Sequence, residues 1–224
     1  KTESQAHASG TESEEEIMIK PKGTIEIAKI PLQETRLFQY RYPDWKKLYS
    51  KLMPEIKRHK MADPKGLPGG NARCWRGIKE YTHQKDLLKP INTIVSGWLA
   101  HYFPGDYFRA HVNYWTNINK PGSLNMIHNH VMASCHLSGV YYVQGEKTGA
   151  IRFYTHEQLY NLIPDGMPYQ NKIGHGPSDG DILLFPSYLQ HDVDVNLSNR
   201  DRITIGFNVV LKKKGEKSND ETKH

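Results

Sequence analysis

The second half of the chain alternates apolar and polar residues in short stretches that turn residues separate. Such alternation is typical of strands that bury one face. After Gly105 it predicts six strands, at residues 108–118, 137–144, 150–155, 181–185, 190–195 and 202–211. Because no helical pattern separates these strands, they favour an antiparallel sandwich or barrel over a fold of alternating strands and helices.

The first half of the chain places its apolar residues at helical spacing instead. Two helices are predicted, at residues 44–59 and 86–103. We expect Pro54 to interrupt the first helix or to end it early. Pro90 is expected in the first turn of the second helix, where its missing N–H costs little. Two short strands are also predicted, at residues 25–27 and 36–40.

Neither end of the chain shows apolar periodicity, and both ends are expected to be disordered. The predicted organisation is an acidic tail at residues 1–18, a helical and mixed support region at 19–104, a jelly-roll core at 105–211 and a basic tail at 212–224. The fold class is therefore α+β in content and mainly β in architecture, a jelly roll with N-terminal helices packed on one sheet.

Composition adds few constraints to this picture. The 224 residues carry a net charge of +6, but their basic residues are dispersed, so nucleic acid is not an expected partner. No apolar run approaches the roughly 18 residues that span a bilayer, which predicts a soluble protein with no membrane partner. Cys74 and Cys135 make no disulfide framework and are expected to be free thiols in a reducing compartment, the cytoplasm.

The histidines of the core carry the candidate chemistry. In an extended segment residues i and i+2 point to the same face. His128 and His130 can therefore present ring nitrogens to one metal ion while Asn129 faces away. A third ligand from a distant strand, for which His191 is the best candidate, leaves the opposite positions open for substrate and oxygen. Non-haem Fe(II) oxygenases need that geometry.

The neighbours of His191 are not expected to reach the same metal ion. If His191 points at the metal, Asp192 and Asp194 lie on the other face of their strand. For His111 and His136 two roles stay open: each lies near the site without touching metal, or is a plain core or strand residue.

The last predicted strand has a polar face that begins at Arg202 and an apolar face that begins at Ile203. A buried guanidinium must meet a carboxylate. Two kinds of partner stay open, an internal acid such as Asp179 or Asp181, and a dicarboxylate cofactor that the hydroxyl of Thr204 also binds. The position of Arg202 shortly after the candidate metal ligands favours the cofactor.

Several motifs occur together in one order along the core. They are Trp115-Thr116-Asn117, His128-Asn129-His130, Ser138-Gly139-Val140-Tyr141-Tyr142, Gly180-Asp181 followed by Phe185-Pro186-Ser187 and His191, and Arg202-Ile203-Thr204. With them the chain resembles a family of 2-oxoglutarate- and Fe(II)-dependent oxygenases that is known mostly from bacteria and marine phages. The resemblance spans residues 105–211. It implies a double-stranded β-helix with iron at its open end, and the cytosol of a bacterium or of a phage-infected host.

The resemblance also implies which residues bind the metal ion. His128 and His191 would be iron ligands, and His130 would take the place of the aspartate that the wider superfamily uses. Three neutral imidazoles leave the iron one unit more positive than two imidazoles and a carboxylate do, which changes its redox tuning. A carboxylate from elsewhere in the chain stays open as the third ligand.

For 2-oxoglutarate the resemblance implies that Arg202 binds the distal carboxylate, assisted by Thr204 and Tyr142. Asn117 or Asn125 would serve the near carboxylate. The implied reaction uses O2 to couple oxidative decarboxylation of 2-oxoglutarate to hydroxylation of a small molecule, or of a protein or peptide side chain.

A long loop at residues 156–178 lies between strands that form the cavity, and we expect it to act as a lid or to select the substrate. Two other functions stay open beside the keto-acid oxygenase. One is a three-histidine, cupin-like dioxygenase that needs no keto acid. The other is a non-enzymatic jelly-roll binding module. The oligomeric state is not predicted.

Overall fold

The computed structural model describes residues 36–67, 74–77, 80–105, 108–154 and 172–213. The predicted tail at residues 1–18 and the predicted strand at 25–27 lie outside the described residues, as does most of the loop at 156–178. In the described part of the chain, no helix is long and apolar enough to cross a membrane.

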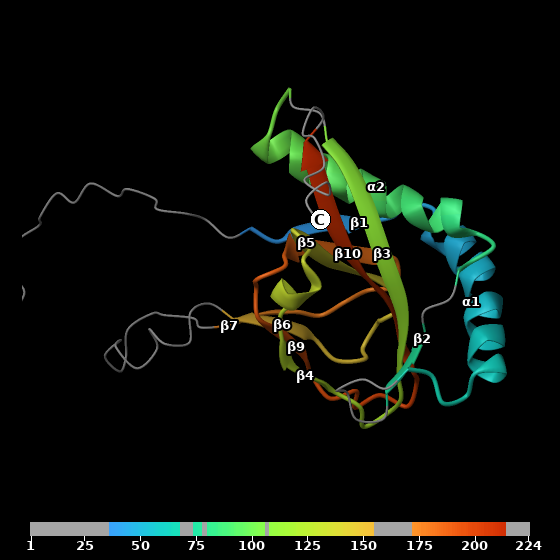
Figure 1. Ribbon diagram of the computed structural model, residues 1–224. Coiled ribbons are helices and arrows are strands. Elements are labelled where there is room, and N and C mark those ends of the chain that lie inside the picture. The colour runs from blue at the N-terminus through green and yellow to red at the C-terminus, as the bar shows by residue number, and fades with distance from the viewer. Residues whose placement is uncertain (1–35, 68–73, 78–79, 106–107, 155–171, 214–224) are drawn as a thin grey trace, which may run out of the picture. The chain divides into compact units, whose positions relative to one another are not determined.

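Among the described residues the strands form two antiparallel sheets (Figure 1). The larger sheet has the order β1 (Phe38–Arg41), β8 (Asp181–Pro186), β5 (Leu137–Gln144), β10 (Arg202–Lys213), β3 (Phe108–Asn119) and β2 (Cys74–Gly77). The smaller sheet has the order β4 (Asn125–His128), β9 (His191–Val193), β6 (Ile151–Tyr154) and β7 (Lys172–His175). The two sheets make the predicted jelly roll, a double-stranded β-helix, and confirm the fold class.

Two helices, α1 (Trp45–Ala62) and α2 (Gln84–Tyr102), cover the face of the larger sheet that points away from the smaller one (Figure 1). Their buried apolar residues include Leu52 and Ile56 of α1 and Leu87 and Ile91 of α2, all at 0 % exposure. They belong to one core cluster with the strands of the larger sheet. The helices therefore support the sheet that carries most of the candidate site.

β10 runs between β5 and β3 and serves two environments at once. The side chains of Ile203, Ile205, Phe207 and Val209 belong to the core beneath the helices. The residues Arg202, Thr204, Gly206 and Asn208 line a cavity on the other face. The predicted split of this strand into an apolar and a polar face is confirmed, because a strand alternates its side chains. The strand reaches Lys213, two residues into the predicted basic tail.

The prediction that Pro54 interrupts or ends the first helix is wrong, since α1 continues past it to Ala62. Proline removes one backbone hydrogen bond and frees a carbonyl one turn earlier. The side chain of Pro54 is exposed, so water can satisfy that carbonyl. The buried neighbours Met53 and Ile56 hold the helix on the sheet.

The second helix begins earlier than predicted, at Gln84, which places Pro90 in its second turn rather than its first. Glu55 of α1 explains this start. Its carboxylate is buried, and it accepts hydrogen bonds from the backbone N–H of Thr82 and from Nδ1 of His83. These bonds fix the chain at the beginning of α2.

We expect Gly139→Ala to destabilise the protein. A Cβ at residue 139 would clash with the ring of Phe207 and with the carbonyl oxygen of Leu183, and both belong to the packed centre of the larger sheet. Overpacking of this kind costs about 1–3 kcal/mol. Gly97→Ala is the control, because residue 97 lies in α2 with nothing within 4 Å of its Cβ position.

Urea denaturation measures both effects. The control should gain roughly 0.5–1 kcal/mol, since alanine loses less conformational entropy than glycine in a helix. A Gly139→Ala variant as stable as the unchanged protein would contradict the assigned packing of β5 against β10.

Candidate metal centre

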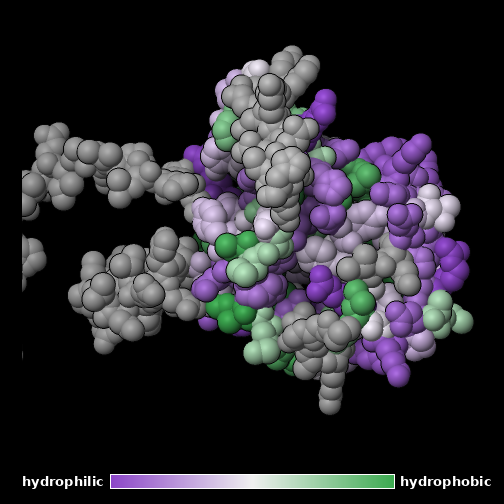
Figure 2. All heavy atoms as spheres, in the orientation of Figure 1, coloured by the Kyte–Doolittle hydropathy of each residue, from purple (hydrophilic) through white to green (hydrophobic). Residues whose placement is uncertain are grey.

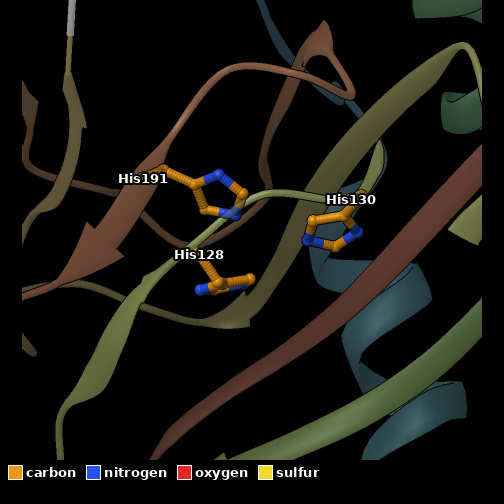
Figure 3. Close-up of side chains that lie close together, drawn as sticks. All are labelled: His128, His130 and His191. Atoms are coloured by element: carbon orange, nitrogen blue, oxygen red, sulfur yellow. The ribbon is translucent and has the colours of Figure 1, made fainter. Parts of the chain in front are cut away.

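Three histidines converge at one end of the smaller sheet (Figure 3). His128 ends β4 and lies directly opposite His191, the first residue of β9. His130 follows two residues after β4. One ring nitrogen of each histidine lies within 4.8 Å of the others, and the ring centroids of His128 and His191 are 4.3 Å apart. The predicted trio therefore does come together, in an arrangement that could hold one metal ion.

His130 reaches this cluster in a different way from the predicted one. The expected extended segment ends at His128, and His130 has a ψ of 19°, which is a bend rather than a strand conformation. The backbone N–H of His130 donates to the carbonyl of Ser187 at 2.8 Å, and the short 3₁₀ helix η1 (Val131–Ala133) follows. The hydrogen bond to Ser187, which directly follows β8, thus holds a bend that turns the ring of His130 toward the other two histidines.

Each imidazole is oriented by a hydrogen bond from Nδ1. The acceptor is the carbonyl of Met126 for His128, at 2.7 Å, and the carbonyl of Leu189 for His191, at 2.9 Å. For His130 it is Oδ1 of Asn208, at 2.8 Å. Because a carbonyl oxygen only accepts, Nδ1 carries the hydrogen and Nε2 keeps its lone pair. That lone pair is what a metal ion needs.

Burial keeps the rings of His191 and His130 neutral. His191 is 4 % exposed, and desolvation together with the neighbouring His128 lowers its pKa to about 3. Desolvation also lowers the pKa of His130, although its hydrogen bond to Asn208 opposes that shift. Neutral imidazoles are the form that binds a metal, so neither ring has to lose a proton near pH 7.

The acids beside His191 point away from the cluster, as predicted. Asp192 accepts two hydrogen bonds from Arg152, from Nε at 2.7 Å and from Nη2 at 2.5 Å. Asp194 forms an ion pair with Nη1 of the same arginine at 2.6 Å. Within the described residues, no carboxylate joins the three histidines. A ligand set of three neutral nitrogen donors suits a divalent transition metal.

The histidines stand at the edge of a cavity of about 700 Å³. Arg202 lines it and is 1 % exposed. Its Nη1 donates to the carbonyls of Thr148 and Asp194, at 3.0 and 3.3 Å. Its Nη2 is buried without a hydrogen-bond partner. A buried guanidinium with one open donor on a cavity fits the carboxylate of a bound ligand.

The internal partners considered for Arg202 are occupied elsewhere. Asp179 accepts from the backbone N–H groups of Gly145 and Glu146, and Asp181 accepts from that of Ser178. The alternative of an internal salt bridge is therefore wrong for the described residues, where neither acid forms an ion pair with Arg202.

The other predicted cofactor residues line the same cavity. They are Thr204, Tyr142, Asn117 and Asn125. Two further histidines do not belong to it, because His111 and His136 are exposed and lie outside its lining. Sequence reasoning missed Asn208, although its place on the polar face of the last strand was a signal. It also missed Arg76, because the four residues of β2 were not recognised as a strand.

The chain is similar to known proteins over most of its described core. Residues 113–208 match the family described as "Putative 2OG-Fe(II) oxygenase". A prolyl-4-hydroxylase from Pseudomonas putida has a similar structure, with 16 % identity, a TM-score of 0.52, and coverage of 79 % of this chain and 92 % of that chain. Comparison with curated proteins finds no match.

Two further solved structures are similar at 11 % identity each. HygX from Streptomyces hygroscopicus, solved with nickel, 2-oxoglutarate and hygromycin B, has a TM-score of 0.55 and covers 79 % of this chain and 83 % of its own. The α-ketoglutarate-dependent carbocyclase SnoK from nogalamycin biosynthesis has a TM-score of 0.57, with 79 % of both chains covered. At these identities the structures show that the fold is shared.

We expect His128→Ala and His191→Ala to lose stoichiometric binding of Fe(II), because each removes one of three convergent nitrogen donors. The loss should exceed the roughly 10- to 100-fold that a change behind a ligand causes. Anaerobic Fe(II) titration measures it. His111→Ala is the control, since its exposed ring hydrogen-bonds Asn113 and lies outside the cavity lining. A His128→Ala variant that still binds one Fe(II) per chain would show that this histidine is not a ligand.

Asn208→Ala should weaken metal binding by roughly 10- to 100-fold, because His130 loses the acceptor that orients its ring. Asn113→Ala is a matched control, since Asn113 faces Asn208 across β3 and β10 but hydrogen-bonds His111, which lies outside the metal centre. The same titration decides between the two outcomes. Equal Fe(II) affinity in Asn208→Ala and the unchanged protein would mean that His130 needs no such support.

Proposed function

We propose that the chain hydroxylates a C–H bond of an organic substrate bound in the cavity beside the three histidines. The match of residues 113–208 to the family of 2OG-Fe(II) oxygenases supports this proposal. The chain is a 2-oxoglutarate- and Fe(II)-dependent oxygenase, and O2 is its co-substrate. The buried, unpartnered Nη2 of Arg202 is the observation that carries the assignment to this cavity.

His128, His130 and His191 would hold the iron through Nε2, each fixed from behind by its own acceptor. When bound, the iron supplies the redox chemistry that couples decarboxylation of 2-oxoglutarate, which yields succinate, to hydroxylation of the substrate. The chain's part is to hold three imidazole rings so that one ring nitrogen of each converges on one position. The remaining positions are then free for the keto acid and for oxygen.

Arg202 would bind the distal carboxylate of 2-oxoglutarate. Thr204 lies opposite Tyr142 in the register of β10 and β5, so both hydroxyl groups can assist on the same cavity wall. Burial raises the pKa of Tyr142, which keeps its phenol protonated and able to donate. For the near carboxylate we propose Asn117 or Asn125. Oδ1 of Asn125 accepts from Asn119, which leaves its Nδ2 to donate.

The exposure of the histidines distinguishes a buried end of the cavity from an open end. His191 is buried, His130 is half-buried and His128 is exposed. Arg202 belongs to the buried end. The keto acid would therefore lie deep, where water is excluded, and the substrate would approach from the side of His128. A small molecule or a side chain of a peptide would fit such an approach.

The match of residues 113–208 to the 2OG-Fe(II) oxygenase family favours the keto-acid oxygenase over the two alternatives that the residues left open, the dioxygenase without a keto acid and the non-enzymatic module. We place the enzyme in the cytosol, because Cys74 and Cys135 are both free thiols. Nucleic acid is not proposed as a partner.

We expect Arg202→Gln to weaken the binding of 2-oxoglutarate on the order of 100-fold, because the buried positive charge that would pair with the distal carboxylate is lost. Fe(II) binding should be unchanged. Anaerobic titration of the Fe(II)-loaded protein, followed by the visible charge-transfer band of the keto-acid complex, measures both. Arg200→Gln is the control, since this half-buried arginine pairs with Asp179 and does not line the cavity. Unchanged keto-acid affinity in Arg202→Gln would show that 2-oxoglutarate does not bind at Arg202.

The reaction itself is tested by succinate formation in the presence of peptides, amino acids and nucleosides. A true substrate should raise succinate release and gain one oxygen atom from ¹⁸O2. A folded, Fe(II)-loaded protein that shows no keto-acid band would contradict the proposed function.

A further inference from the structure

We propose that Arg76 binds an anionic group of the substrate, so that the enzyme acts on an organic acid that joins a carboxylate or a phosphate to an apolar body. This inference rests on the proposed function, since it assigns the substrate class of that same cavity. It starts from a residue that neither the metal centre nor the keto-acid site uses.

Arg76 lies on the cavity face of the larger sheet. It belongs to β2, the edge strand, and faces Asn117 of β3, which in turn faces Thr204 of β10. These three residues form one cross-strand row, and all three line the cavity. Direct neighbours across strands point to the same face, so the row brings Arg76 to the wall that the cofactor residues share.

An aromatic stack holds the guanidinium in place. Its central carbon lies 4.9 Å from the centre of the Trp115 ring, and that ring stacks on His130 with centroids 5.8 Å apart and an interplanar angle of 26°. Trp115 in turn lies over Gly206, where any Cβ would clash with the indole. Arg76 is thus separated from the candidate metal ligands by a single ring.

The charge of Arg76 has no counterpart in the described residues. Its Nε is buried without a hydrogen-bond partner, and no acid forms an ion pair with it there. Arg152 and Arg200 differ in this respect, because each pairs with an aspartate. None of the described residues that line the cavity is an aspartate or a glutamate. An oriented guanidinium with an open donor in such a cavity fits an anion.

That anion is not the distal carboxylate of the keto acid. In our proposal the distal carboxylate accepts from the open Nη2 of Arg202 at the buried end of the cavity. Arg76 is half-buried and lies beyond the Trp115 ring. It therefore faces space that the substrate enters.

The rest of the substrate would meet an apolar rim, which we define as Met126, Ile127 and Met132. These residues line the cavity although their side chains are 63 %, 45 % and 94 % exposed. Figure 2 shows hydrophobic residues gathered where β4, β6 and β9 lie in Figure 1, beside hydrophilic ones. Exposed apolar residues at the mouth of a charged cavity suit a ligand with one anionic and one apolar end.

The test measures binding to the anaerobic, Fe(II)- and 2-oxoglutarate-loaded protein by calorimetry. The probes are benzoate and phenyl phosphate, which separate the carboxylate from the phosphate, and the uncharged benzamide. The unchanged protein should bind one of the acids at least about tenfold more tightly than benzamide. Arg76→Gln should abolish that preference and leave benzamide binding as it was. Arg109→Gln, an exposed arginine of β3, is the control and should keep the preference.

Several outcomes overturn the inference. They are the absence of a charge preference in the unchanged protein, a preference that survives Arg76→Gln, and a preference that Arg109→Gln removes equally. Keto-acid affinity is measured on the same samples. If Arg76→Gln weakens 2-oxoglutarate binding as Arg202→Gln should, then Arg76 belongs to the cofactor site and the inference fails. If the unchanged protein binds no 2-oxoglutarate, the proposed function fails, and the charge preference is then judged on the Fe(II)-loaded protein alone.

Discussion

The strict alternation of side chains along β10 is the constraint on which the rest of the structure depends. One face of this strand packs under two helices, and the other face forms the wall of the cavity. Burying an aliphatic or aromatic side chain contributes about 1.5–3 kcal/mol, so four such residues hold the strand firmly. The polar face includes a guanidinium with 1 % exposure, which would be costly without that support. The position of the cofactor residues is therefore as fixed as the core.

The same strand links the cofactor wall to the metal centre. Asn208, three positions beyond Ile205 on the opposite face, accepts hydrogen bonds from His130 and from Ser138. The hydroxyl of Ser138 donates to the same oxygen at 2.9 Å. A ligand that arrives from a bend rather than a strand is thus fixed by a residue of the central strand. The other two rings are oriented by carbonyl groups two residues earlier in the chain, those of Met126 and Leu189.

Charge gives the cavity a consistent character. Neutral imidazole ligands add no charge to the two positive charges of Fe(II). The two negative charges of 2-oxoglutarate would cancel those of the iron. Arg202 and Arg76 then remain as positive groups on the walls, with no acid among the described lining residues. A cavity of this kind favours anionic ligands at both of its ends. The three-histidine set and the second arginine thus support the same substrate class.

The sequence predicted those parts in which one local rule decides the structure. The faces of residues 202–211 and the strand at 137–144 follow from period-two alternation, and both are confirmed. The bend at His130 could not be predicted, because it depends on a hydrogen bond to Ser187, which is distant in the chain. The prediction for Pro54 was wrong because the free-energy cost of a proline inside a helix depends on whether water reaches the freed carbonyl group, and Pro54 is exposed. Arg76 was missed because a four-residue edge strand carries too little pattern to recognise.

Trp115 has a consequence of its own. Its indole lies between a guanidinium and an imidazole of the candidate metal centre. Indole emission is sensitive to nearby charge and to electron-accepting neighbours, so the molecule has an intrinsic optical probe at the place where two ligands would meet. Loading of the site would change the light that this residue emits. In a variant whose other three tryptophans are replaced, the order in which ligands enter could be followed in real time without any added label.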